Sequence, residues 1–390
     1  MAPTLRLPGG EPYAPAPARP WPATAPPVRC RRVYAAAHVV GRPARSRALA
    51  SAGSASVAGA GTAVDWDETL SFRHYLWGLG FGVADAMDTA QRGMGMDWPT
   101  TVELIRRSAA DAATVGGALA CGAGTDQLDL GSRPKVPDVL DAYREQLEVV
   151  EGAGATVILM ASRALAAAAS GPEDYLSVYG TLLREVRGPV ILHWLGEMFD
   201  PALRGYWGST DLDAAADTVL ALIGEHADRV DGIKVSLLDK EREVALRRAL
   251  PAGVRLYTGD DFNYPELILG DAHGFSDALL GIFDGIARPA AAALARLDAG
   301  DTEGYLAAMN PTVPLARHIF AAPTYHYKTG LAFLSWLNGR QSHFRMVGDQ
   351  QNARDAAHLT TLFMLADRAG VLADPDLAVY RMSSFLGQGK

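Results

Sequence analysis

The segment Val230-Asp-Gly-Ile-Lys-Val-Ser-Leu-Leu238 is a short, largely apolar run with Lys234 at its centre. A strand with this pattern is typical of a parallel sheet that is covered by helices on both faces. Seven other short runs share the pattern, and helical stretches follow most of them. The eight predicted strands are residues 32–40, 82–88, 118–122, 155–160, 189–193, 232–236, 254–258 and 274–279.

The stretches between these strands carry helical spacing. Val139, Tyr143, Leu147 and Val150, for example, recur at intervals that place them on one helix face. Strand–helix alternation predicts right-handed βαβ units, and eight units fit a closed (β/α)8 barrel better than a doubly wound sheet. The doubly wound alternative also lacks its glycine fingerprint. We therefore expect an α/β fold, a (β/α)8 TIM barrel with a C-terminal helical extension.

Composition predicts how the chain is divided. Residues 1–28 are rich in Pro and Ala and lack periodicity, so we expect a disordered tail. Residues 41–64 are mostly Ala, Ser and Gly, which favours a flexible insertion inside the barrel of residues 29–288. Residues 289–390 contain helical patterns and no further strand, which predicts a C-terminal helical region.

Charge and cysteine content exclude several classes of protein. The 390 residues include 36 basic and 44 acidic side chains, so the net charge of −8 gives a nucleic-acid partner no electrostatic support. Two cysteines are too few for a disulfide framework or a thiolate metal cluster. The sequence has neither an apolar run of the ~20 residues that span a bilayer nor a secretory signal pattern. We expect a cytoplasmic protein without membrane or nucleic-acid partners.

Lys234 is the most informative polar residue, because a lysine inside an apolar strand is either paired or used chemically. Burial lowers the pKa of an amine and makes it nucleophilic, and a neutral lysine condenses with a carbonyl group to an imine. The alternative is a structural ion pair with Asp231, Asp88 or Asp260. The residue pattern alone leaves both interpretations open.

Three segments carry a family resemblance: Gly232-Ile-Lys-Val-Ser236, Tyr257-Thr-Gly-Asp-Asp261 and His273-Gly-Phe-Ser-Asp277. They resemble the dihydrodipicolinate synthase/N-acetylneuraminate lyase superfamily of class I aldolases. Pro323-Thr-Tyr-His-Tyr-Lys328 and Pro189-Val-Ile-Leu-His193 also resemble stretches of that family. The resemblance implies a TIM barrel, Lys234 as the imine-forming residue on the sixth strand, no cofactor, and a homo-oligomer.

The sequence also departs from that family. His193 stands where the family has a tyrosine, so we expect His193 to act as the general acid/base. The motif that grips the keto-acid carboxylate corresponds to Asp88-Thr-Ala-Gln-Arg92, in which Thr89 alone is retained, and Glu197 replaces an arginine. We therefore expect a divergent branch of that superfamily. The predicted substrate-binding residues are Asp88, Thr89, Arg92, Glu197, Ser236, Asp260, Asp261 and Ser276.

The expected function is a carbon–carbon lyase that acts on a small-molecule carbonyl substrate, an oxo acid or a keto sugar, through an imine of Lys234. A dehydratase acting on a keto-deoxy sugar acid would use the same imine. A third hypothesis is a metal-dependent barrel hydrolase or isomerase. Its metal ligands would come from His193, Glu197, Asp88, Asp126 and His273. A degenerate barrel that binds a sugar without catalysis is a fourth.

Overall fold

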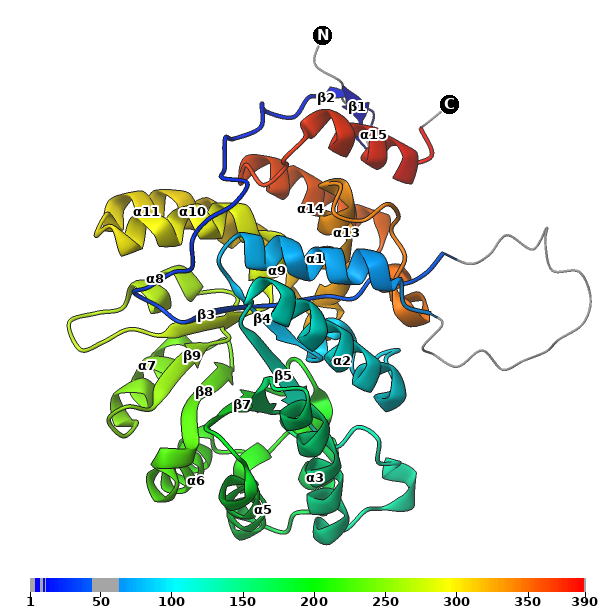
Figure 1. Ribbon diagram of the computed structural model, residues 1–390. Coiled ribbons are helices and arrows are strands. Elements are labelled where there is room, and N and C mark those ends of the chain that lie inside the picture. Colours follow the sequence, from blue (N-terminus) through cyan, green and yellow to red (C-terminus); the bar gives the residue numbers. More distant parts are fainter. Residues whose placement is uncertain (1–3, 8–9, 11, 44–62, 389–390) are drawn as a thin grey trace, which may run out of the picture.

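Eight parallel strands close into a barrel in the computed structural model, which describes residues 4–7, 10, 12–43 and 63–388 (Figure 1). Around the barrel the strand order is β10-β3-β4-β5-β6-β7-β8-β9. The strands are β3 (Val33–Ala36), β4 (Gly82–Asp85), β5 (Leu119–Ala123), β6 (Thr156–Leu159), β7 (Val190–Leu195), β8 (Val230–Ser236), β9 (Arg255–Thr258) and β10 (Asp277–Leu280). Each of the eight predicted strands overlaps one of these, so the predicted TIM barrel is confirmed.

Helices surround the barrel and continue beyond it (Figure 1). Those up to the last barrel helix are α1 (Trp66–Gly78), α2 (Trp98–Val115), α3 (Val136–Gly152), α4 (Arg163–Ala168), α5 (Pro172–Glu185), α6 (Leu212–Glu225), α7 (Lys240–Ala249), α8 (Tyr264–Leu269), α9 (Ile282–Gly285) and α10 (Ala287–Asp298). The C-terminal region adds α11 (Thr302–Met309), α12 (Val313–Ile319), α13 (Tyr327–Leu337), α14 (Ala356–Arg368) and α15 (Pro375–Phe385). No helix among the described residues has the length and hydropathy that crossing a bilayer requires. The boundary expected at residue 288 falls inside α10.

Side chains fill the barrel interior, where glycines make room for two tyrosine rings. A Cβ atom at Gly82 would lie 2.6 Å from the ring of Tyr34, and one at Gly232 would lie 2.8 Å from the ring of Tyr257. The interior is therefore a packed core and not a pore, as in other barrels of this class. This packing leaves the carboxyl ends of the strands as the place for a site.

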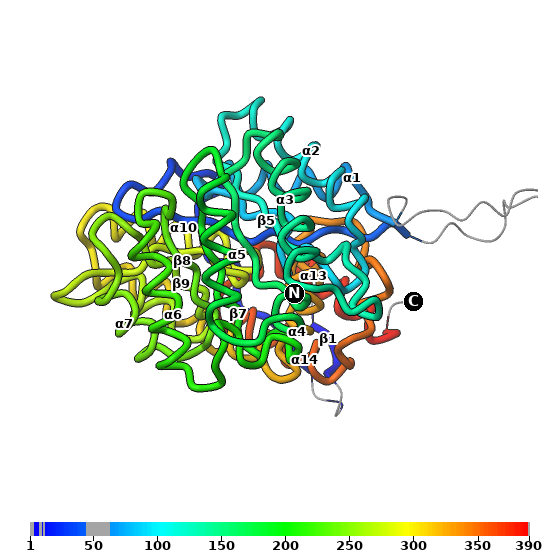
Figure 2. Tube along the Cα trace, turned by 90° about the horizontal axis from the view of Figure 1, so that it is seen from below, coloured from blue at the N-terminus to red at the C-terminus, as the bar shows by residue number. Residues whose placement is uncertain are grey.

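The N-terminal segment differs from the expected disordered tail. β1 (Leu5–Arg6) pairs with β2 (Pro12–Tyr13), and the chain then follows the C-terminal helices. The Tyr13 hydroxyl donates to Asp367 at 2.5 Å, and the Trp21 indole donates to the Gly370 carbonyl at 2.6 Å. β1 lies beside the C-terminal helices in both views (Figures 1 and 2). A proline-rich segment lacks periodicity and can still be held in extended form by single side-chain anchors, which periodicity does not detect.

The expected flexible insertion at 41–64 falls mostly outside the described residues, which exclude 44–62. Its two ends are described, and Gly41 forms an antiparallel bridge with Val64.

The C-terminal region covers the carboxyl ends of β3 and β4. The Tyr327 and Thr89 hydroxyls lie 2.8 Å apart, and the Gln91 amide donates to the Val347 carbonyl at 2.8 Å. Because the active end of a TIM barrel is formed by the carboxyl ends of its strands, the C-terminal helices contribute to the wall of any site there.

A buried ion pair joins α1 to the end of β4. The Arg73 guanidinium faces the Asp85 carboxylate at 2.8 Å and 3.0 Å, and neither side chain is exposed. Ser108 on α2 also donates to Asp85, at 2.6 Å, so the carboxylate has partners on two helices. This network holds α1 and α2 against the strand that leads into the candidate site.

A second buried carboxyl group lies outside the barrel wall. Glu243 on α7 is buried and accepts hydrogen bonds from Ser276 at 2.8 Å and from Thr258 at 3.0 Å. Burial raises the pKa of Glu243 to about 8, although the two hydroxyl donors act in the opposite direction. Glu243 is therefore mostly protonated and uncharged in the folded protein near neutral pH.

We expect Asp85→Ala to lower the free energy of unfolding by about 3–5 kcal/mol, because it leaves the Arg73 cation buried without a counter-ion. Glu103→Ala breaks the exposed Arg107–Glu103 pair on α2 and is the matched control, with an expected loss of about 0.5 kcal/mol or less. Urea unfolding of both variants measures the difference. Equal losses would show that the buried pair does not stabilise the junction.

We expect the wild type to lose stability relative to Glu243→Gln as the pH rises from 5 to 8. In this range the folded chain keeps the Glu243 proton and the unfolded chain, with an ordinary pKa of 4.5, releases it. The free energy of unfolding then falls with pH, by at most about 1.4 kcal/mol per unit from this group. Thermal or urea unfolding at several pH values tests this, and parallel curves for the two proteins would refute it.

Candidate active site

Lys234 lies in the middle of β8, inside the barrel. The strand register pairs Lys234 with His193 on β7 and with Tyr257 on β9. A Cβ atom at Gly259, the residue that follows β9, would lie 2.8 Å from Lys234 Cε, so glycine is needed for the lysine side chain to fit. Lys234 is 8 % exposed, and burial lowers the pKa of its amine, while the negative charges of Asp88 and Asp261 partly offset that effect.

The structural ion pair considered for Lys234 is not formed. Within the described part of the chain, no carboxylate oxygen lies within 4.0 Å of its Nζ atom. Asp231 instead accepts the Tyr257 hydroxyl at 2.5 Å near the start of β8. Asp260 accepts the backbone N–H groups of Phe262 and Asn263 at 2.8 Å and 3.0 Å. The amine is therefore buried without a direct counter-ion.

His193 lies beside Lys234 on the neighbouring strand β7. Its Nε2 atom lies 3.3 Å from the Ser236 hydroxyl, and its Nδ1 atom is buried without a hydrogen-bond partner among the described residues. Burial, together with the charge of Lys234, lowers the pKa of His193 well below its usual value. Burial therefore disfavours the imidazolium form of His193, and its role as general acid/base stays a prediction.

Asp261 has the properties expected of a proton donor. The residue is buried, and one of its carboxylate oxygens accepts the Ile282 N–H at 2.8 Å. Burial raises the pKa of Asp261 to about 7, and the nearby Lys234 limits that rise. The carboxyl group that titrates near neutrality thus follows the seventh barrel strand, β9, next to the lysine.

Asp88 and Thr89 lie in a strained turn directly after β4. Ala86 and Gln91 on either side of them adopt the left-handed backbone region, with φ of 51° and 63°. Non-glycine residues reach this region at a cost of about 1–3 kcal/mol, and such strain clusters at functional sites. The Thr89 hydroxyl lies 2.8 Å from that of Tyr327, whose ring stacks on Phe320.

The site residues predicted from the sequence do not include Tyr327 and Lys328. Burial lowers the pKa of Lys328 to about 8, and its Nζ atom donates to the Tyr325 carbonyl at 3.1 Å and approaches Met94 Sδ at 3.4 Å. Both residues belong to the Pro323–Lys328 motif, which was the sequence signal available for them. They begin α13 and bring the C-terminal region into the site.

Four predicted substrate-binding residues form hydrogen bonds or ion pairs within the protein. Arg92 uses all three guanidinium nitrogens on Asp126, Gln146 and the carbonyls of Ala86 and Gly122, so it is not free to grip a carboxylate. Asp260 fixes the turn before α8. Ser276 donates to Glu243 outside the barrel interior. Glu197 is exposed and faces Arg204 at 3.8 Å. Spacing at a strand end does not distinguish a binding residue from a turn or wall residue.

Two hollows open at the carboxyl end of the barrel. One of about 120 Å³ is lined by Asp88, Ser162 and Arg163. The other, a groove of about 660 Å³ over the ends of β7 and β8, holds Glu197 and Lys240. Lys234 is not among the residues that line these two hollows, so its amine is nearly closed off in this conformation.

The residues considered for a metal-dependent reaction are dispersed. His193 lies inside the barrel, whereas Asp126 pairs with Arg92 and Glu197 with Arg204. His273 belongs to an exposed loop and donates its backbone N–H to Asp271 at 2.7 Å. The described side chains of this set therefore do not converge on one point.

The fold is that of dihydrodipicolinate synthases. A putative dihydrodipicolinate synthetase from Pseudomonas aeruginosa is 15 % identical, with a TM-score of 0.62 over 87 % of this chain and 99 % of that chain. Dihydrodipicolinate synthase from Thermotoga maritima is 13 % identical, with a TM-score of 0.64 over 88 % of this chain and 100 % of that chain. No protein with a curated description matches the sequence.

One family model covers nearly the whole sequence. It carries the description "Protein of unknown function (DUF993)" and matches residues 8–389. The match includes the barrel and the C-terminal helices, and the low identity to the solved synthases agrees with a divergent branch of their fold. The chain belongs to the DUF993 family, whose barrel here has the dihydrodipicolinate synthase fold.

Proposed function

We propose that this protein is a class I lyase that forms an imine between Lys234 and a carbonyl substrate. The observation that carries the proposal is a buried lysine amine without a direct counter-ion, near a carboxyl group, Asp261, with a pKa of about 7. An amine whose pKa is lowered is nucleophilic at neutral pH, and a neutral acid beside it supplies the proton that imine formation needs.

The first chemical step is addition of the neutral Lys234 Nζ to the substrate carbonyl. The resulting carbinolamine loses its hydroxyl group as water, with a proton from Asp261, and an iminium ion forms. The iminium then accepts the electron pair of the bond between the α- and β-carbons of the substrate, which breaks to give an enamine and an aldehyde. The Asp261 carboxylate takes the proton from the substrate hydroxyl as that aldehyde forms, so the acid is regenerated.

His193 and the Thr89–Tyr327 pair support these steps without changing charge. The lowered pKa of His193 keeps its imidazole neutral, so the ring orients the Ser236 hydroxyl beside the amine and does not donate a proton. The hydroxyls of Thr89 and Tyr327 can hydrogen-bond substrate oxygens where Asp88 adjoins them.

The charges around Lys234 favour a neutral polyhydroxylated substrate, such as a keto sugar, over an α-oxo acid. The negative charge of Asp88 acts on the amine and would repel a carboxylate placed next to the carbonyl carbon. Arg92 is fully used by protein acceptors and cannot compensate that repulsion. We infer that the carboxylate grip of the resembling family is absent because the substrate has no carboxylate at this position.

Dehydration is the second candidate reaction. The same iminium acidifies the neighbouring carbon, and an acid with a pKa of about 7 can protonate a leaving hydroxyl group as well as a carbinolamine. The position of Asp261 thus serves both reactions, and product analysis of a substrate that gives an imine separates them.

We expect borohydride reduction in the presence of dihydroxyacetone to add one reduced adduct to Lys234, because the imine forms there. An adduct blocks tryptic cleavage at this residue, so the mass gain should appear on the peptide of residues 230–240. Lys328→Arg serves as the matched control, since Lys328 is also a buried lysine with a lowered pKa.

Three results would count against the proposal in different ways. An adduct on residues 318–340 would move the imine to Lys328. Trapping with pyruvate but not with dihydroxyacetone would overturn the substrate class alone. No adduct with any ketone or aldehyde of a broad panel would overturn the imine chemistry itself.

We expect the trapping rate of the wild type to fall as the pH rises above about 7, because Asp261 then loses the proton that it donates. Asp261→Asn should remove this limb of the pH profile and slow trapping by about 10²–10⁴-fold, the usual contribution of general acid catalysis. Asp260→Asn is the control, because Asp260 is adjacent to Asp261 in sequence but holds the turn before α8. If the trapping rate of Asp261→Asn still falls above about pH 7, another group donates the proton.

A further inference from the structure

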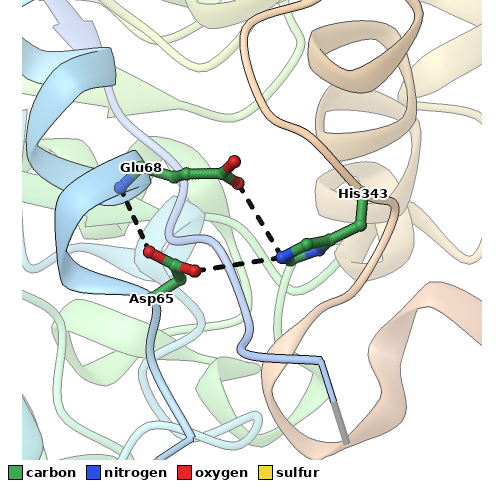
Figure 3. Close-up of side chains that lie close together, drawn as sticks. All are labelled: Asp65, Glu68 and His343. Atoms are coloured by element: carbon green, nitrogen blue, oxygen red, sulfur yellow. Dashed lines mark hydrogen bonds and ion pairs between the residues drawn. The ribbon is translucent and has the colours of Figure 1, made fainter.

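Two carboxylates and one imidazole converge at the start of α1, away from Lys234 (Figure 3). Asp65 caps α1, Glu68 lies in its first turn, and His343 comes from the loop that follows α13. His343 Nε2 lies 3.9 Å from Asp65 Oδ2 and 3.8 Å from Glu68 Oε2. One ligand atom from each residue lies within 4.8 Å of the other two.

Two of these ligand atoms are buried polar atoms without partners. Glu68 Oε2 and His343 Nε2 are shielded from solvent, and neither makes a hydrogen bond within the part of the chain that the structure describes. Their separation of 3.8 Å is too long for a hydrogen bond between them. Because buried polar atoms in native proteins almost always have a partner, this pair requires one.

The remaining oxygens of both carboxylates are occupied, which fixes how the free oxygens point. Glu68 Oε1 accepts the Ser342 N–H at 2.8 Å, and Asp65 Oδ1 accepts the Glu68 N–H at 3.2 Å. Oε2 and Oδ2 are thereby left to face His343 (Figure 3). An open hollow, which Glu68, Gln341 and Ser342 help to line, adjoins the cluster and gives an ion access from solvent.

We propose that Asp65, Glu68 and His343 bind one divalent transition-metal ion of the Zn²⁺ class. His343 Nε2, Asp65 Oδ2 and Glu68 Oε2 supply one nitrogen and two oxygen ligands, and water completes the coordination. An imidazole ligand suits Zn²⁺ and its neighbours in the first transition series, whereas Mg²⁺ and Ca²⁺ prefer oxygen ligands alone. Metal–ligand bonds of about 2.0–2.2 Å would form after a small decrease in the distances between the three ligand atoms.

The ion would brace the wall over the carboxyl end of the barrel. The side-chain Nε2 of Gln341 donates to the His343 backbone carbonyl at 2.7 Å, and the side-chain Oε1 of Gln341 lies 2.9 Å from His38 Nε2. His38 follows β3 and is held by Asp284 at 2.7 Å, in α9 after β10. Metal binding at this seam would therefore stabilise the junction between the barrel and the C-terminal region and would take no part in the chemistry of Lys234.

The test uses the full chain after removal of bound metal with a chelator. Titration with ZnCl₂ by calorimetry, with metal content by mass spectrometry, should give one Zn²⁺ per wild-type chain and a rise in the melting temperature. Asp65→Asn preserves the helix cap, and Glu68→Gln preserves the acceptor for Ser342, so both variants should fold. Each should weaken Zn²⁺ binding at least tenfold and lose the melting shift.

His74→Ala is the matched control, because His74 on the same helix pairs with Asp111 at 3.0 Å without a third ligand. This variant should bind Zn²⁺ as the wild type does. Wild-type protein that binds no Zn²⁺, or variants at Asp65 and Glu68 that bind it unchanged, would overturn the site. Mg²⁺ binding as tight as that of Zn²⁺ would overturn the assigned class of ion.

Discussion

An ammonium group taken from water into a closed barrel must either find a counter-ion or lose its proton, because an uncompensated buried charge is very costly. Lys234 has no carboxylate within ion-pair distance among the described residues, and burial lowers its pKa. Asp261, close by, has a raised pKa of about 7. Both shifts favour the neutral amine next to the neutral acid. The proposed chemistry depends on this one consequence of burial.

The C-terminal region matters to the site because it supplies side chains that the barrel lacks. Tyr327 reaches Thr89, and Lys328 approaches Met94 in the loop after β4. Gly281 after β10 leaves space for this arrangement, since a Cβ atom there would lie 3.3 Å from the Tyr327 ring. The helices after the barrel therefore form part of the active end. A change in the packing of these helices would move the Tyr327 hydroxyl, which lies near Asp88.

The strands and the position of Lys234 could be predicted because both depend on local patterns. Apolar runs of four to seven residues are visible in the sequence, and a lysine inside one is conspicuous. The role of Arg92 could not be predicted, since its partners Asp126 and Gln146 come from separate elements. The lowered pKa of His193 depends on burial and on a neighbouring strand. Tyr327 contacts Thr89 across 238 positions of the chain, a pairing that only the tertiary fold determines.

The departures from the resembling family are consistent with one another when charge is considered. A site that holds an α-oxo acid needs hydroxyl or cationic groups near the imine and tolerates few carboxylates. Here the carboxyl groups of Asp88 and Asp261 influence the pKa of Lys234, and Arg92 forms an ion pair with Asp126. A carboxylate on the substrate would meet the negative charge of Asp88 and no free guanidinium. A neutral substrate with several hydroxyls would meet Asp88 as a hydrogen-bond acceptor, so the lost carboxylate grip and the presence of Asp88 both agree with the proposed substrate class.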